Sequence, residues 1–365
     1  MTTANDSAYM QMALTLARKG LGKVSPNPCA GAVVVRDGQV IGKGWHRRVG
    51  TPHAEINALK EAGPRATSAT IYINLEPCNH HGRTPPCTEA ILTAGIKRVV
   101  FGMFDPNPQA GGGGAYLAQQ GLEVVGGVLA EQCRRLNRPF IKWASTGQPW
   151  VLLKAALSLD GRIATISGAS KWITGEKSRR VTHRLRCQSD AILVGVETVL
   201  ADDPALTTRL PGRGGRDPLR IILDSHLRTP PTARVINRNS AATWIFCGPQ
   251  ADDNRARRLR EAEVEIHQVG LAADGFLALP EVLAGLGSAG VSTLLVEGGG
   301  RVHGAFLREQ LADELAFFIA PMLIGGDGLA VVGSLALNDL DQTPRLSEIS
   351  HRRYGDDLLI RGLLN

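Results

Sequence analysis

Four side chains in two short stretches constrain this chain more than any other feature. The stretch Thr51-Pro-His-Ala-Glu55 supplies His53 and Glu55, and a second stretch beginning at Glu76 supplies Cys78 and Cys87. One imidazole and two thiolates suit a catalytic zinc ion, which takes three protein ligands and keeps one position open for water. The first half of the chain must therefore bring two separate segments together around one point.

The spacing of His53 and Glu55 predicts different tasks for them. They stand two residues apart at the start of a predicted helix, so their side chains cannot point the same way. We expect His53 to bind the metal and Glu55 to move protons at the water, and this order of residues is used by zinc-dependent nucleobase deaminases. A purely structural zinc site, with His80 or His81 as a fourth ligand, is the alternative.

The surrounding sequence predicts an α/β domain. Apolar strands are expected at 31–36, 39–45, 69–74, 98–102 and 122–125, with helices between them. The segment 138–149 contains two prolines and a Ser-Thr-Gly run, and it is the expected joint between domains 1–147 and 148–365.

A strand, a glycine turn and a helix at 294–304 form the clearest pattern of the second half. Backbone N–H groups at the start of a helix bind phosphate, and glycines let it approach. The spacing departs from the dinucleotide-binding fingerprint, so an ordinary tight turn remains the alternative. Polar loops at 158–174 and 195–207 follow other predicted strands and are further candidates for binding.

Composition narrows the possible partners and location. The 365 residues carry a net charge of +7, with no block of like charges, which argues against nucleic acid. Six scattered cysteines do not resemble a disulfide framework, and neither a signal peptide nor an apolar run of 18 residues is present. We therefore expect a cytoplasmic protein without a membrane span.

The first half resembles the bifunctional riboflavin biosynthesis deaminase/reductases. The resemblance rests on Ser25–Pro28, His53–Glu55, the long loop Leu75–Cys87 and Asp105–Gln109. It implies a cytidine-deaminase-like α/β/α domain that removes the 2-amino group of 2,5-diamino-6-ribosylamino-4(3H)-pyrimidinone 5′-phosphate. It also implies that Asn27 holds the pyrimidine and that Arg83 holds the phosphate, with a solvated loop arginine as the alternative for Arg83.

The glycine turn of this half departs from the family pattern. A basic residue is expected there, and Gly113 stands in its place. A phosphate contact from that turn is therefore in doubt.

The second half resembles the reductase domain of the same family, which has a dihydrofolate-reductase-like α/β fold. The resemblance implies NADPH-dependent reduction of the ribosyl group to a ribityl chain, and a homo-oligomer is expected. Glu197 stands where a small residue is expected, and Asp202 is a guess for the proton donor. The implied nucleotide contacts are Ala156, Trp172, Thr198, Asp202, Ser225, Gly299, Gly300, Arg301, Val302, His303, Gly304 and Ala305. The implied substrate contacts are Lys154, Ser170, Arg186, Leu206, Arg209 and Glu297, with Arg186 and Arg209 as candidate phosphate anchors.

Two hypotheses from other functional classes compete with the deaminase/reductase hypothesis. A nucleic-acid base deaminase with an appended domain would fit the zinc pattern, but the long Cys loop and the lack of a basic cluster argue against it. A ligand-binding regulator would be expected to have lost Glu55 or a zinc ligand, and all of these are present. On the side-chain level, Trp172 and Leu206 could be core residues instead of ligand contacts.

Overall fold

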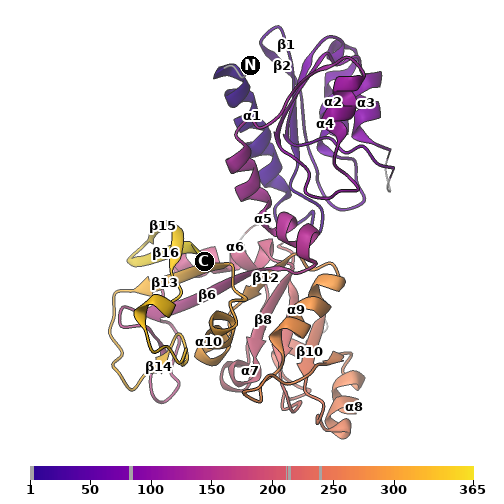
Figure 1. Ribbon diagram of the computed structural model, residues 1–365. Coiled ribbons are helices and arrows are strands. Elements are labelled where there is room, and N and C mark those ends of the chain that lie inside the picture. Colours follow the sequence, from indigo (N-terminus) through magenta and orange to yellow (C-terminus); the bar gives the residue numbers. More distant parts are fainter. Residues whose placement is uncertain (1–3, 82–84, 211, 213–214, 238–240) are drawn as a thin grey trace. The chain divides into compact units, whose positions relative to one another are not determined.

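The chain forms two units, Met1–Gly147 and Gln148–Asn365 (Figure 1). The computed structural model describes residues 4–81, 85–210, 212, 215–237 and 241–365. In both units strands alternate with helices, which confirms the predicted α/β class.

A five-stranded sheet in the order β2-β1-β3-β4-β5 is the centre of the first unit. Strand β1 pairs antiparallel with β2 and β3, whereas β3, β4 and β5 run parallel. The strands are β1 (Gly31–Arg36), β2 (Gln39–Trp45), β3 (Thr70–Leu75), β4 (Arg98–Met103) and β5 (Glu123–Val125). The helices are α1 (Ala4–Ala17), α2 (Ala54–Ala62), α3 (Cys87–Thr93), α4 (Gly113–Gln119) and α5 (Ala130–Thr146), with 3-10 turns at η1 (Arg18–Gly20) and η2 (Gly63–Ala66).

Helices cover both faces of this sheet. Ala32 and Val34 of β1 pack in one core cluster with residues of α2, α3 and α4. Val33 and Val35 point to the opposite face and pack with α1 and Cys133 of α5. A strand buried on both faces reads as a continuous apolar run, and the result is an α/β/α sandwich.

Two glycines let helix α2 lie directly on strand β2. A Cβ atom on Gly44 would stand 2.1 Å from the Ala54 carbonyl oxygen, and one on Gly42 would stand 2.3 Å from that of Ala58. Any side chain there would push the helix away. The close approach fixes the start of α2, where His53 and Glu55 lie.

The expected joint at 138–149 is wrong in its first part, because α5 continues through Pro139 to Thr146. The buried side chain of Asn137 explains this continuation. Its Oδ1 accepts from the Cys29 N–H at 2.8 Å, and its Nδ2 donates to the Cys29 carbonyl at 3.2 Å. Phe140 is also buried, so packing offsets the hydrogen bond that proline cannot make. Gly147, with φ of +70°, then ends the helix.

A nine-stranded sheet in the order β11-β10-β9-β8-β12-β6-β13-β16-β15 is the centre of the second unit. Strands β11 to β13 in this order are parallel, and β16 and β15 are antiparallel additions. The strands are β6 (Trp150–Ser158), β7 (Arg162–Ala164), β8 (Ala191–Gly195), β9 (Leu219–Leu223), β10 (Thr243–Cys247), β11 (Glu265–Gln268), β12 (Thr293–Val296), β13 (Glu314–Ala320), β14 (Leu329–Ala330), β15 (Leu346–Tyr354) and β16 (Asp357–Leu364). The helices are α6 (Glu176–Gln188), α7 (Val196–Asp202), α8 (Asp253–Glu261), α9 (Leu279–Ser288) and α10 (Gly300–Arg308), with 3-10 turns at η3 (Arg234–Ile236) and η4 (Leu340–Gln342).

Helices α6, α7 and α8 pack on one face of this sheet, and α9 and α10 pack on the other. Strand β12 pairs with Trp150–Leu153 of β6, so Lys154 and Glu297 both lie just past the end of their pairing. The carboxyl ends of parallel strands are the usual place for ligands in such sheets. The polar residues singled out in the sequence therefore gather at the edge where a binding site is expected.

Candidate active sites

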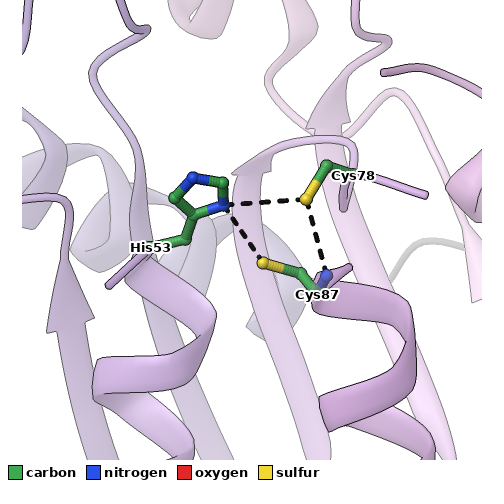
Figure 2. A group of neighbouring side chains, drawn as sticks. All are labelled: His53, Cys78 and Cys87. Carbon is green, nitrogen blue, oxygen red and sulfur yellow. Dashed lines mark hydrogen bonds between the residues drawn. The ribbon is translucent and has the colours of Figure 1, made fainter. Parts of the chain in front are cut away.

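His53, Cys78 and Cys87 converge on one point (Figure 2). The Nδ1 atom of His53 lies 3.3 Å from the Cys87 Sγ and 3.6 Å from the Cys78 Sγ. Their donor atoms all lie within 4.8 Å of one another. This two-thiol, one-imidazole set suits zinc in its catalytic form.

The three side chains of this cluster come from the ends of three elements. His53 is the residue before α2, Cys78 follows β3, and Cys87 is the first residue of α3. The Cys87 N–H points at the Cys78 Sγ at 3.4 Å, which holds the two cysteines together. Hydrogen bonding from Cys87 outweighs burial and lowers the pKa of the Cys78 thiol to about 4, with His53 adding to the effect.

A fourth protein ligand is missing from the described part of the chain. The cluster of potential metal donors there contains these three residues alone. His81 is instead paired with Glu89 at 3.1 Å on the surface. An open coordination position is what a catalytic zinc site requires, so the structural alternative gains no support.

Glu55 is buried beside this cluster, and its Oε2 atom has no hydrogen-bond partner among the described residues. Burial raises the pKa of its carboxyl group, and the neighbouring Cys78 adds to the rise while His53 opposes it. A buried carboxylate oxygen without a partner is costly unless a ligand meets it. Its position therefore fits a group that exchanges protons with a bound water.

A cavity of about 370 Å³ opens above the cluster, and Asn27, His53, Glu55, Cys78 and His80 contribute to its wall. Asn27 is held by a residue that the sequence analysis missed, His46. The Nε2 atom of His46 lies 3.1 Å from the Asn27 Nδ2, and its Nδ1 lies 3.3 Å from the Pro52 carbonyl.

Burial lowers the pKa of His46, with Pro52 opposing this and His53 adding to it. A neutral ring can donate only from the nitrogen that faces a carbonyl, so Nδ1 carries the proton and Nε2 accepts from Asn27. A lone buried histidine after a strand gave no signal of this role in the sequence.

Other residues of the cavity wall were also not assigned from the sequence. Asn107 belongs to the Asp105–Gln109 motif, which supported the resemblance without receiving a role. Phe140 and Trp143 come from the part of α5 that was expected to be a linker. Arg83 lies outside the described residues.

The turn at Gly113 has a structural reason for its glycine. A Cβ atom there would lie 1.9 Å from the Pro77 carbonyl oxygen, so no side chain fits. The start of α4 is occupied by Glu76, which accepts from the Gly114 N–H at 3.0 Å and from the Asp105 N–H at 3.2 Å. A carboxylate already fills the place where this turn could have met a phosphate.

A second cavity, of about 550 Å³, lies in the second unit at the carboxyl end of β12 and beside Lys154–Ala156 of β6. It brings together many of the residues expected to bind nucleotide or substrate. Those in its wall are Lys154, Ala156, Ser170, Trp172, Arg186, Thr198, Asp202, Arg209, Glu297 and Gly299. Trp172 is 66% exposed, so it is not a core residue.

A buried charged cluster forms the floor of this cavity. Both carboxylate oxygens of Glu297 accept from Arg186, each at 2.9 Å, and Lys154 Nζ lies 3.6 Å from the same carboxylate. Burial alone would raise the pKa of Glu297, but Arg186 and Lys154 lower it to about 2. Burial lowers the pKa of Lys154, and Glu297 opposes the change. Arg186 is thus committed to Glu297 and is poorly placed as a phosphate anchor.

Several expected contacts lie outside the wall of this cavity. Leu206 is packed in the core, as its alternative interpretation holds. The His303 side chain is fully buried, and its Nδ1 lies 3.0 Å from the Val331 carbonyl. The remaining expected nucleotide contacts that do not line the cavity are Ser225, Gly300, Arg301, Val302, Gly304 and Ala305.

The glycines of the 298–304 turn serve two purposes. A Cβ atom on Gly300 would lie 2.3 Å from the Ala330 carbonyl oxygen, and one on Gly304 would lie 3.2 Å from the Gly333 nitrogen. Both are needed for packing inside the protein. Gly299 has open space around it and faces the cavity, so it is the glycine that a phosphate could approach.

The structure adds two residues, Arg179 and His183, that the sequence analysis missed. Arg179 stacks over the Trp172 ring at 4.5 Å and donates to the Thr174 carbonyl. His183 also lines the cavity. Both lie on α6, and neither was assigned a role from the sequence.

Comparisons with known proteins match both halves of the chain. The profile of the cytidine and deoxycytidylate deaminase zinc-binding region matches residues 3–103, and that of the RibD C-terminal domain matches residues 149–360. The riboflavin biosynthesis protein RibD of Aquifex aeolicus is 42% identical over 97% of both chains. That of Escherichia coli is 41% identical over 97% of this chain and 98% of its own.

Solved structures agree with these matches. Acinetobacter baumannii RibD (form 1) superposes with a TM-score of 0.89 at 36% identity, over 99% of each chain. A diaminohydroxyphosphoribosylaminopyrimidine deaminase/5-amino-6-(5-phosphoribosylamino)uracil reductase from Thermotoga maritima gives 0.86 at 37% identity, again over 99% of each. A cytidine-deaminase-like domain with a zinc site is followed by an NADPH-dependent reductase domain. The chain belongs to the RibD family of bifunctional riboflavin biosynthesis deaminase/reductases.

Proposed function

We propose that His53, Cys78 and Cys87 hold the zinc ion of the deaminase domain and that Glu55 is its proton-transfer group. The observation that carries this proposal is the convergence of the three donor atoms beside a buried carboxylate with an unpartnered oxygen. Zinc at this position supplies a bound water whose pKa is lowered to near neutrality. The other steps fall to the side chains of the cavity.

Glu55 takes a proton from the attacking water at Oε2 and delivers it to the pyrimidine, whose amino group then leaves as ammonia. Asn27, oriented by His46, holds the edge of the ring. The buried wall formed with Phe140 keeps bulk water away from the reacting carbon. Arg83 keeps its proposed role as a phosphate contact.

We also propose that the second cavity binds NADPH and the deaminated, phosphorylated substrate side by side. The cofactor supplies the hydride that reduces the ribosyl carbon. Gly299, Trp172, Thr198 and Asp202 line the cavity as nucleotide contacts. The other proposed nucleotide contacts lie outside the cavity wall, and they would reach the nucleotide through their backbone or after a movement of the chain. They are Gly300, Arg301, Val302, Gly304, Ala305 and Ser225.

The proton for this reduction is better assigned to Lys154 than to Asp202. Lys154 is buried at the cavity floor, and its lowered pKa favours release of a proton. Asp202 is partly exposed and lies 3.8 Å from Lys171. Ser170 and Glu297 complete the substrate side of the cavity.

The remaining proposals concern partners and location. A homo-oligomer remains the proposed assembly state. Six free cysteines suit the reducing cytoplasm, and the absence of a block of like charges in the sequence supports a small-molecule substrate over nucleic acid. None of the described helices is long and apolar enough to cross a membrane.

Two single variants test the assignment of the two sites. Glu55→Gln should abolish ammonia release from the diaminopyrimidine while NADPH oxidation with the deaminated substrate continues. Lys154→Met should have the reverse effect. Ammonia release that survives in Glu55→Gln would overturn the deaminase assignment, and NADPH oxidation that survives in Lys154→Met would overturn the proton-donor assignment.

A further inference from the structure

The segment 203–209 borders the second cavity in an unusual backbone conformation. Asp203 and Leu206 have φ angles of +42° and +50°, in the left-handed region that residues other than glycine rarely adopt. Leu206 is buried at the same time. A strained segment keeps one shape only where its surroundings hold it.

Side chains, and not strand pairing, hold three consecutive residues of this segment. The Thr207 carbonyl accepts from Arg186 Nη1 at 3.2 Å, and the Thr208 N–H donates to Asp217 Oδ1 at 2.6 Å. The Arg209 N–H donates to His183 Nδ1 at 3.3 Å. His183 therefore fixes the backbone of the residue that carries the Arg209 side chain into the cavity.

The ring of His183 is in the state that this contact needs. Burial, followed by the charges of Arg186 and Arg209, lowers its pKa to about 4, while Glu297 and the Thr207 carbonyl oppose the change. The ring is therefore neutral in the physiological range. Because Nδ1 accepts a hydrogen bond, the proton is on Nε2.

Arg209 has no carboxylate partner among the residues that the structure describes. Within the described part of the chain no hydrogen bond or ion pair of its guanidinium is found, and burial together with Arg186 and Arg234 lowers its pKa. Arg186 is occupied by Glu297. A positive corner that lacks a counter-charge fits a doubly charged phosphate, which a guanidinium binds through paired hydrogen bonds.

We propose that His183 is a positioning residue for substrate binding in the reductase domain, acting through Arg209. Its imidazole holds the 206–209 segment so that the Arg209 guanidinium meets the phosphate of the substrate. The inference rests on the proposed function of the second cavity. It identifies His183 as the side chain that fixes the position of Arg209, the proposed phosphate contact.

A double-mutant cycle tests this role. His183→Ala, Arg209→Ala and the double variant are compared by the KM and kcat of NADPH oxidation with the deaminated, phosphorylated substrate. Removing the Arg209 cation should raise KM by about 10- to 100-fold, and His183→Ala should raise it by about three- to tenfold, the range for one neutral hydrogen bond. In the Arg209→Ala background, His183→Ala should add little, because its effect passes through Arg209.

Two further variants separate positioning from simple packing. His183→Asn keeps an acceptor near the place of Nδ1 and should stay within about twofold of the unchanged protein in KM, by the same hydrogen-bond scale. Arg184→Ala, on the exposed side of α6, removes a charge without touching the segment and serves as the matched control. The Kd for NADPH should be unchanged in His183→Ala. Should His183→Ala fail to fold, His183→Gln, whose acceptor lies farther out, takes its place with the same expectations.

The outcomes distinguish the proposed phosphate contact of Arg209 from the positioning role of His183. If Arg209→Ala leaves KM unchanged, the phosphate assignment within the proposed function is wrong. If Arg209→Ala raises KM but His183→Ala adds its full effect in the double variant, the positioning role is wrong. A rise in the NADPH Kd equal to that in KM, or no recovery in His183→Asn, would also overturn it.

Discussion

The carboxylate of Glu297 should be worth more to the stability of the second unit than any exposed acid. It accepts both hydrogen bonds from Arg186 and faces Lys154, and all three side chains are largely buried. Glu297→Gln keeps the shape but removes the negative charge, so two buried cations lose their counter-charge. Breaking a buried pair from one side costs about 3–5 kcal/mol.

That free energy corresponds to a measurable change in melting temperature. For a unit of this size each kcal/mol lowers Tm by about 2–4 °C, so the transition of the second unit should fall by roughly 6–20 °C. Scanning calorimetry with and without NADPH identifies that transition, because ligand binding raises it. Glu176→Gln is the matched control, since its pair with Arg180 is exposed and should contribute about 0–1 kcal/mol.

A second variant shows whether charge is the cause. Lys154→Met in the Glu297→Gln background removes one of the two stranded cations and should recover part of the lost stability. The reasoning is refuted if Glu297→Gln lowers Tm no more than Glu176→Gln does, or if the Lys154→Met change deepens the loss.

Three other perturbations have defined outcomes. A zinc chelator should stop ammonia release and leave NADPH oxidation with the deaminated substrate intact; a parallel loss of both activities would contradict separate sites. Gly44→Ala, whose Cβ would lie 2.1 Å from the Ala54 carbonyl, should displace α2 and reduce deaminase activity at least tenfold while the reductase, assayed in the same sample, is unaffected. The pKa of Glu297 is lowered to about 2, so the stability that it provides is present above about pH 4.5 and is lost as the pH falls toward 2; melting curves against pH should show this acid dependence, and Glu297→Gln should flatten it.

The proposed zinc site could be predicted because the types of its residues indicate metal binding by themselves. Two cysteines, a histidine and a nearby carboxylate in a fixed order leave few other uses, and the three proposed ligands do converge. The role of His46 could not be predicted in the same way. A single histidine that follows a strand is chemically compatible with a core position, and only its contacts to Asn27 and the Pro52 carbonyl show which groups it holds.

The charged cluster of the second cavity was recognised residue by residue but not as a unit. Lys154, Arg186 and Glu297 come from β6, α6 and the end of β12, and the sequence gives no sign that they neutralise one another. Arg186 therefore looked like a phosphate anchor, although its guanidinium is occupied. Sequence position identifies a cation, whereas its availability depends on which carboxylate the fold brings to it.

Glycines also cannot be assigned a role from sequence alone, because the same residue type is needed for close packing inside the protein and for the approach of a ligand. In the 298–304 turn, Gly300 and Gly304 are required by the backbone of 330–333, while Gly299 alone of these three faces the cavity with free space. At Gly113, where a basic residue was expected, the Pro77 carbonyl leaves no room for any side chain. A glycine that admits a ligand and a glycine that admits a neighbouring chain are identical in sequence. The distance from a hypothetical Cβ to the nearest atom separates them, and of these glycines it leaves only Gly299 open to the proposed phosphate contact.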